Sequence, residues 1–163
     1  MTTAIYTGSF DPITLGHLNL IKRASKVFDR VIVCIMYNKD KHPLFTMEER
    51  VRQVRTVTQR FPNVEVDSSD MLVAEYARLK GAGVVVRGLR AVSDYEKECQ
   101  MALINKLLNP ELETFFLPAS EKYMYLSSSA VKELALFGAD LSAFAPREII
   151  GEIEAKFDGK GRK

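Results

Sequence analysis

The sequence predicts an α/β protein, a single doubly wound domain built on a five-stranded parallel sheet. Short β-branched runs alternate with longer segments of helical periodicity, which is typical of parallel α/β sheets. The run 31–37 is apolar throughout, as expected for a strand covered on both faces. Four of the five predicted strands are followed by polar residues, and open parallel sheets bind ligands beyond the carboxyl ends of their strands.

The predicted elements follow in order along the chain. The expected strands cover residues 4–7, 31–37, 64–67, 84–86 and 114–117. The expected helices cover residues 16–28, 46–60, 71–80, 94 to just before 110, 127 or 128 to 138, and a last helix with Pro146 in its first turn.

Helix ends are predicted from residues that satisfy free backbone groups. Thr46 and Glu49 have the spacing of a capping box, in which each side chain accepts a hydrogen bond from the other residue's backbone. Asp94 is expected to cap the long fourth helix. Gly81 stands where a helix ends in the left-handed conformation, and Gly138 is expected to stop the fifth helix.

Composition sets the class of protein. The chain has 163 residues, of which 47% are hydrophobic and 27% charged, so one ordinary domain (1–163) is expected, with 157–163 as a flexible tail. The longest apolar run is far shorter than the ~20 residues that cross a bilayer, and no leader precedes Ala4, so we expect a cytoplasmic protein with no membrane partner. Cys34 and Cys99 are then expected to be reduced thiols in the core. A net charge of +2 is too weak to indicate nucleic acid.

The segment after the first strand carries the first candidate site. Gly8 permits a tight turn, and Gly16 leaves room for a phosphate near a helix start, where exposed N–H groups favour anions. His17 in the first turn could stabilise charge on a transferring phosphoryl oxygen, as a cation or as an N–H donor. Taken alone, this pair fits a surface histidine beside an ordinary turn glycine better than a catalytic site.

Basic residues follow the second and fourth strands. Arg87 and Arg90 flank Gly88 and Leu89 and could clamp phosphate oxygens. Glu98 could accept hydrogen bonds from a sugar or order Arg90, although a surface acid on a helix is an equal alternative. Lys41 could reach a phosphate, with a solvated loop as the alternative.

Three serines, Ser127, Ser128 and Ser129, open the helix that follows the fifth strand. They offer hydroxyl and backbone N–H groups to an anion, whereas a plain helix cap needs only one serine. No nucleophile elbow, P-loop or dinucleotide fingerprint is present. His17 and His42 have no third ligand at sensible spacing, so no protein metal site is predicted.

Combined, these motifs resemble a known superfamily. The run Thr14-Leu15-Gly16-His17 is similar to the Thr/His-x-Gly-His motif of nucleotidyltransferases. Leu126-Ser127-Ser128-Ser129 with Lys132 is similar to the second motif, Ile-Ser-Ser-Thr-x-x-Arg. The runs 8–14, 45–50 and 87–92 narrow the resemblance, which covers residues 4 to 155, to the bacterial phosphopantetheine adenylyltransferases. The chain departs from the family motifs at three positions: Ser9 stands where Thr is frequent, Leu126 stands in place of Ile, and Lys132 stands in place of Arg. A lysine does not offer the bidentate phosphate contact that an arginine makes at position 132.

The resemblance implies a Rossmann-like nucleotidyltransferase fold and a function. Members transfer AMP from ATP to 4′-phosphopantetheine with Mg²⁺, giving dephospho-coenzyme A and pyrophosphate, and are typically cytoplasmic homohexamers. By matched position, His17 stabilises the transition state, and the acceptor contacts are Ser9, Lys41, Val73 and Arg87. The implied ATP contacts are Ser9, Phe10, His17, Gly88, Leu89, Arg90, Glu98, Tyr123, Met124, Tyr125, Leu126, Ser127, Ser128 and Ser129.

The implied reaction is an in-line displacement without a covalent intermediate, because the acceptor phosphate is itself a nucleophile. The Mg²⁺ is expected on ATP oxygens and water, since the sequence offers no carboxylate cage. Two alternatives stay open: a related nucleotidyltransferase with another acceptor, such as nicotinamide mononucleotide or glycerol phosphate, and a nucleotide-binding regulatory module without catalysis.

Overall fold

The computed structural model describes residues 1–37 and 42–158, and the sheet that it contains is the predicted one. All five strands run parallel in the order β3-β2-β1-β4-β5, so the strand order reverses between β1 and β4. The strands are β1 (Thr3–Gly8), β2 (Arg30–Met36), β3 (Val64–Ser69), β4 (Val84–Leu89) and β5 (Glu113–Pro118).

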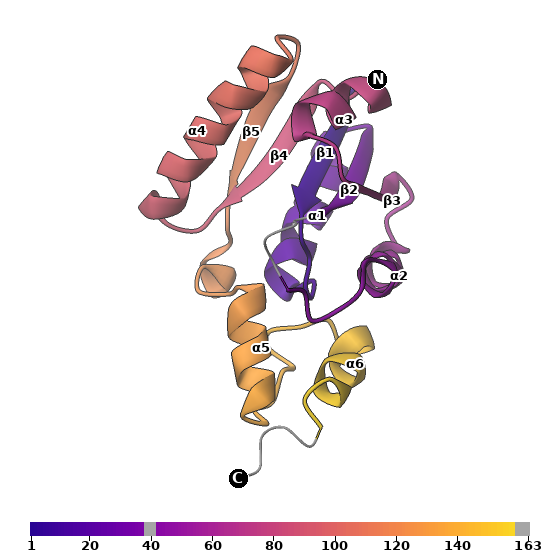
Figure 1. The fold of residues 1–163 in the computed structure, drawn as a ribbon, viewed down its shortest axis with the longest axis vertical. Coiled ribbons are helices and arrows are strands. Elements are labelled where there is room, and N and C mark those ends of the chain that lie inside the picture. Colours follow the sequence, from indigo (N-terminus) through magenta and orange to yellow (C-terminus); the bar gives the residue numbers. More distant parts are fainter. Residues whose placement is uncertain (38–41, 159–163) are drawn as a thin grey trace.

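Helices cover both faces of this sheet, and two further helices lie beyond one end of it (Figure 1). The α-helices are α1 (Leu15–Val27), α2 (Met47–Thr58), α3 (Val73–Lys80), α4 (Val92–Leu108), α5 (Ser128–Leu136) and α6 (Ile150–Ala155). Two single turns of 3-10 helix, Glu121–Tyr123 and Arg147–Ile149, precede α5 and α6. No helix in the described ranges is long and apolar enough to cross a membrane.

The alternation of side chains along the central strands divides the core into two clusters. On β1, Ala4 and Tyr6 face the larger cluster, which α1, α2, α5 and α6 complete, whereas Ile5 faces a smaller cluster that includes residues of α3. Because both faces of β2 are covered, its interior is apolar at every position.

Several helix ends form as predicted. Thr46 and Glu49 make the expected capping box, with Thr46 N–H donating to Glu49 Oε2 at 2.8 Å. Gly81 ends α3 in the left-handed region at φ 64°, and Gly138 follows α5 at φ 71°. Ser127 is the N-cap of α5, accepting a hydrogen bond from the N–H of Ala130.

Other predicted boundaries were wrong. The prediction ended the fourth strand at Val86, but β4 continues through Leu89 because residues 87–89 pair with β5. The N-cap of α4 is Ala91 rather than Asp94, whose carboxylate instead accepts a hydrogen bond from the Arg90 N–H. Pro146 caps a 3-10 turn rather than lying in the first turn of α6, and Phe157, placed in the expected tail, packs against the core.

The two cysteines differ in their surroundings. Both thiols are free, in agreement with the expected reduced state. Cys34 is fully buried in β2, and that burial raises the pKa of its thiol to about 11. Cys99 lies in α4 and is only half-buried, so the prediction that it belongs to the core was wrong.

Close packing between β4 and α1 generates a stability prediction at Gly88. A Cβ atom at this position would overlap the Cδ1 atom of Leu20, a buried residue of α1. We expect Gly88→Ala to lower the free energy of unfolding by about 1–3 kcal/mol, as overpacking does. Urea denaturation measures this change. In a Leu20→Ala background, Gly88→Ala should lower the free energy of unfolding by much less. An equal decrease in both backgrounds would contradict the packing explanation.

Candidate active site

Three segments that follow β1, β4 and β5 meet at the carboxyl edge of the sheet. The Ser128 hydroxyl donates to the carbonyl of Pro12 at 2.7 Å, joining the start of α5 to the loop after β1. Arg90 Nη1 donates to the carbonyl of Leu126 at 3.0 Å, joining the end of β4 to the same region. The segments whose motifs the sequence singled out therefore form one site.

His17 is fixed by a reciprocal cap at the start of α1. The N–H of Thr14 donates to His17 Nδ1 at 3.1 Å, and the N–H of His17 donates to Thr14 Oγ1 at 3.3 Å. Because Nδ1 accepts a main-chain hydrogen bond, the hydrogen of the neutral ring is on Nε2. The ring also packs edge to face with Phe10, with centroids 5.2 Å apart. His17 thus presents a single oriented N–H donor.

The surroundings of His17 favour the neutral imidazole. Burial and, to a smaller extent, the positive charge of Arg90 lower its pKa to about 4. Of the two possibilities that the sequence left open, cation or N–H donor, this lowered pKa favours the neutral N–H donor.

The turn after β1 has an unusual backbone at Phe10. This residue has φ 45°, which is uncommon for a residue other than glycine. Its ring is buried against Tyr6, at a centroid distance of 5.4 Å, and against His17. Ser9, which precedes it, directs its carbonyl oxygen to Arg50 Nη1 at 2.9 Å. The turn therefore places Phe10 beside His17, and Ser9 directly precedes it.

Arg87 does not lie in a loop, as the sequence predicted, but within β4. Its guanidinium makes a bidentate pair with Glu98, at 2.6 and 2.8 Å, and also donates to the carbonyl and hydroxyl oxygens of Thr7. Glu98 consequently orders Arg87 rather than Arg90, which corrects the alternative role predicted for it. Thr7 was not singled out in the sequence.

Arg90 has partners different from those of Arg87. Its Nε atom lies 3.3 Å from Asp94 Oδ2, and its Nη1 atom donates a hydrogen bond to the carbonyl of Leu126. Its side chain is 42% exposed, and the pair with Asp94 is a surface ion pair of low stabilisation. Gly88 and Leu89 lie between the two arginines in β4.

The segment 123–129 packs directly on the start of α1. An added Cβ at Gly16 would lie 3.6 Å from Tyr123 Cβ and 3.8 Å from Leu126 Cδ2. Met124 and Tyr125 are exposed next to this contact, whereas Leu126 is buried. The three serines have separate contacts: Ser127 caps α5, Ser128 anchors the loop after β1, and Ser129 makes no side-chain hydrogen bond within the described ranges.

One predicted acceptor contact, Val73, packs away from this cluster, and another lies outside the described residues. Lys41 lies outside the described residues, as does Lys39. Val73 begins α3 and packs against the smaller core cluster, on the other face of the sheet from α1. Within residues 1–37 and 42–158, no group of three His, Cys, Asp or Glu side chains is placed to hold a metal ion.

Sequence reasoning missed two charged residues at this edge, Asp11 and Arg50. Both are buried, and both line a small cavity with Ser128, Ser129 and Lys132. Asp11 accepts hydrogen bonds from the N–H groups of Leu44 and Phe45, each at 2.9 Å. A signal was available for Arg50, because Arg50, Val54 and Val57 occupy one helical face and a charge on an apolar face is unusual.

Comparison with known proteins finds related sequences that match nearly the whole chain. Residues 5–134 match the family model described as cytidylyltransferase-like. The chain is 52% identical to a phosphopantetheine adenylyltransferase of Alkaliphilus metalliredigens over 156 residues, covering 96% of this chain and 99% of that protein. It is also 52% identical to the phosphopantetheine adenylyltransferase of Caldanaerobacter subterraneus, covering 96% and 98% of the two chains.

Solved structures at low sequence identity share the fold. A protein of Vibrio parahaemolyticus assigned as a nicotinate-nucleotide adenylyltransferase matches with a TM-score of 0.71 at 16% identity, covering 99% of this chain and all of that one. The nicotinic acid mononucleotide adenylyltransferase of Plasmodium falciparum matches with a TM-score of 0.67 at 14% identity, covering 98% and 96% of the two chains.

The lowered pKa of His17 generates a prediction about stability and pH. The pKa of a histidine in an unfolded chain is near 6.5, whereas that of His17 in the folded chain is about 4. Between these two pH values the unfolded chain therefore binds a proton that the folded chain does not bind. We expect His17 to reduce the free energy of unfolding by at most about 3 kcal/mol as pH falls from 6.5 to 4. Chemical denaturation of the wild type and of His17→Asn across this range measures the difference.

The expected result is a wild type that loses more stability than His17→Asn over this interval. His42→Asn removes an exposed histidine and serves as the matched control. Parallel stability curves for the wild type and His17→Asn would contradict the neutral, desolvated imidazole.

Proposed function

The chain belongs to the cytidylyltransferase-like family and, within it, to the phosphopantetheine adenylyltransferases, and from this membership we propose the reaction and its machinery. The protein is an adenylyltransferase of coenzyme A biosynthesis. It moves AMP from ATP to 4′-phosphopantetheine, giving dephospho-coenzyme A and pyrophosphate. The observation that carries the catalytic proposal is the oriented Nε2–H donor of His17 among the three converging segments.

His17 stabilises the transition state as a hydrogen-bond donor. Negative charge builds on the oxygens of the α-phosphorus as the acceptor phosphate attacks, and an N–H group already aimed at that charge lowers the barrier without reorganising. With a pKa of about 4, His17 is neutral at physiological pH before substrate binds. The negative charge of the bound substrates raises the pKa of His17 again. His17 is therefore an electrostatic group rather than a general base.

The displacement is direct, with no adenylyl-enzyme. The acceptor phosphate is a nucleophile at neutral pH and needs no protein group to replace it. His17 is a poor nucleophile here, because Nδ1 accepts the Thr14 N–H and Nε2 carries the hydrogen. Cys34 is excluded by burial and by a pKa of about 11.

Binding of the two substrates is assigned to different segments. ATP contacts Ser9, Phe10 and the stretch 123–129, together with Gly88, Leu89, Arg90 and Glu98. The acceptor contacts Ser9, Lys41, Val73 and Arg87. The support for Glu98 is its fixed orientation, since Arg87 holds both carboxylate oxygens. Mg²⁺ accompanies the nucleotide, because its phosphate oxygens and water supply the hard ligands that this ion prefers.

We propose that the protein acts in the cytoplasm as a homohexamer, and α4 supports the assembly. Asn105 is its only buried residue, whereas Leu103 and Leu107 are 72% and 83% exposed. Further exposed apolar residues of the same helix are Val92, Tyr95, Met101, Ile104 and Leu108. Figure 1 shows α4 at the outer edge of the molecule, beside β5. An apolar surface of this extent is typical of a subunit interface.

Pyrophosphate release tests the proposed reaction. Wild-type protein mixed with ATP and Mg²⁺ should release pyrophosphate only when 4′-phosphopantetheine is added. A related enzyme would require nicotinamide mononucleotide or glycerol phosphate instead, and a regulatory module would bind ATP without releasing pyrophosphate. Labelled AMP retained on the protein after incubation with ATP alone would contradict direct displacement.

Substitution of His17 tests its role in the same assay. His17→Ala should lower kcat by about two to three orders of magnitude, as loss of one preorganised donor does. His17→Gln keeps an N–H donor and should recover part of the loss. Circular dichroism establishes that the variants fold, and a decrease of less than tenfold in folded His17→Ala would rule out the donor role.

Disruption of the α4 surface tests the assembly. Leu107→Glu should dissociate the hexamer, because a buried, unpaired carboxylate is costly at an apolar interface. Val27→Glu is the matched control, since Val27 is 65% exposed but lies on α1. Sedimentation velocity measures both, and a wild type that sediments as a monomer would contradict the proposal.

A further inference from the structure

A small cavity lies between the loop after β1 and the starts of α2 and α5. Its volume is about 80 Å³, and its walls include Ser9, Arg50, Ser128, Ser129 and Lys132. Pockets for whole small molecules usually enclose roughly 300–1,000 Å³. This cavity therefore suits a phosphate-sized group and not a nucleoside.

Arg50 contributes a buried positive charge to the cavity. The residue is only 4% exposed, and its guanidinium donates to the carbonyls of Ser9 at 2.9 Å and Thr46 at 3.3 Å. Among residues 1–37 and 42–158, no carboxylate lies within 4.0 Å of it, and its Nη2 group makes no hydrogen bond. A buried charge is unfavourable without a counter-charge, and in the described part of the chain this guanidinium has none.

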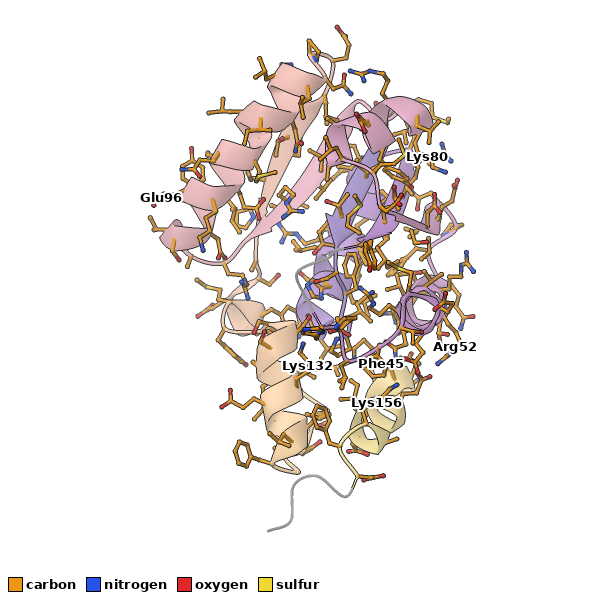
Figure 2. The ribbon with its side chains drawn as sticks, viewed as in Figure 1. Phe45, Arg52, Lys80, Glu96, Lys132 and Lys156 are labelled. Carbon is orange, nitrogen blue, oxygen red and sulfur yellow. The ribbon has the colours of Figure 1, made fainter. Side chains whose placement is uncertain are left out.

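The other charges of the cavity cancel one another. Lys132 Nζ lies 3.3 Å from Asp11 Oδ2, and Asp11 also accepts the N–H groups of Leu44 and Phe45. In Figure 2, Lys132 projects from α5 toward the region of Phe45. Lys132 and Asp11 together are neutral, so among the described residues that line the cavity the charge of Arg50 is the one left unbalanced.

The first turn of α5 provides further anion-binding groups. This helix has nine residues, and Ser127 satisfies only the Ala130 N–H through its side chain. The N–H groups of Ser128 and Ser129 belong to the helix end where the backbone dipoles favour negative charge. The buried guanidinium and this helix start thus border the same cavity.

We propose that Arg50 is a ligand-binding residue that holds the terminal phosphates of the nucleotide, the part that leaves as pyrophosphate. This assignment rests on the proposed adenylyl transfer. Pyrophosphate carries more negative charge than the phosphate monoester of the acceptor, and the cavity combines a buried guanidinium with a helix start. Arg50 also keeps Ser9 in place, so one guanidinium connects the leaving group to the turn that carries Phe10.

Calorimetric titration with inorganic pyrophosphate tests the assignment on the wild type and two variants. Arg50→Gln keeps an N–H donor for the carbonyls but removes the charge, whereas Arg50→Lys keeps the charge. We expect Kd to rise about tenfold or more in Arg50→Gln and clearly less in Arg50→Lys. Arg52→Met is the matched control, because Arg52 is on the same helix but pairs with Glu152 at the surface, and its Kd should stay unchanged.

Other results would overturn the assignment. Equal pyrophosphate affinity in folded Arg50→Gln and in the wild type would do so, as would a loss confined to 4′-phosphopantetheine. Should Arg50→Gln fail to fold, the Nε–H resonance of Arg50 in the wild type, assigned by its absence from Arg50→Lys, gives the answer. It should shift on addition of pyrophosphate, and an unmoved resonance overturns the proposal.

The test separates this site from the proposed function. A wild type that binds pyrophosphate through Arg50 but transfers no AMP would refute the reaction and keep the site. A wild type that transfers AMP but binds pyrophosphate independently of Arg50 would refute the site alone.

Discussion

The position of β1 between β2 and β4, in a sheet whose strands all run one way, is the constraint on which the site depends. Parallel strands end at the same edge, and the reversal of strand order at β1 opens that edge for a ligand. The segments after β1, β4 and β5 can therefore exchange hydrogen bonds directly, as those from Ser128 to Pro12 and from Arg90 to Leu126 show. The roles proposed for His17, Arg90 and the serines of α5 presuppose this convergence.

At this edge of the sheet, most charged side chains already have defined hydrogen-bond or ion-pair partners within the protein. Arg87 is fixed by Glu98 and Thr7, and Asp11 binds two backbone N–H groups and Lys132. Groups held in this way need little reorganisation when charge develops in the transition state. Arg50 differs from them, because only carbonyl oxygens contact its guanidinium in the described part of the chain.

Local sequence signals predicted the elements whose causes are local. The alternation of apolar runs gave the five strands, and the Thr46–Glu49 spacing gave the start of α2, because capping depends on residues three positions apart. The boundaries that failed depend on distant residues. Gly88 and Leu89 remain in β4 because β5 pairs with them, and Asp94 does not cap α4 because it accepts the Arg90 N–H.

The sequence by itself determined the fold class and the family and singled out His17 as a candidate, since each follows from patterns of neighbouring residues. Tertiary structure alone decided that His17 is a neutral Nε2–H donor, because burial and the Thr14 N–H set its protonation. It also decided that Arg87 pairs with Glu98, and that Arg50 and Asp11 face one cavity. The contacts of Asp11, and that of Arg50 with Ser9, join residues 33 to 121 positions apart, so no local pattern encodes them.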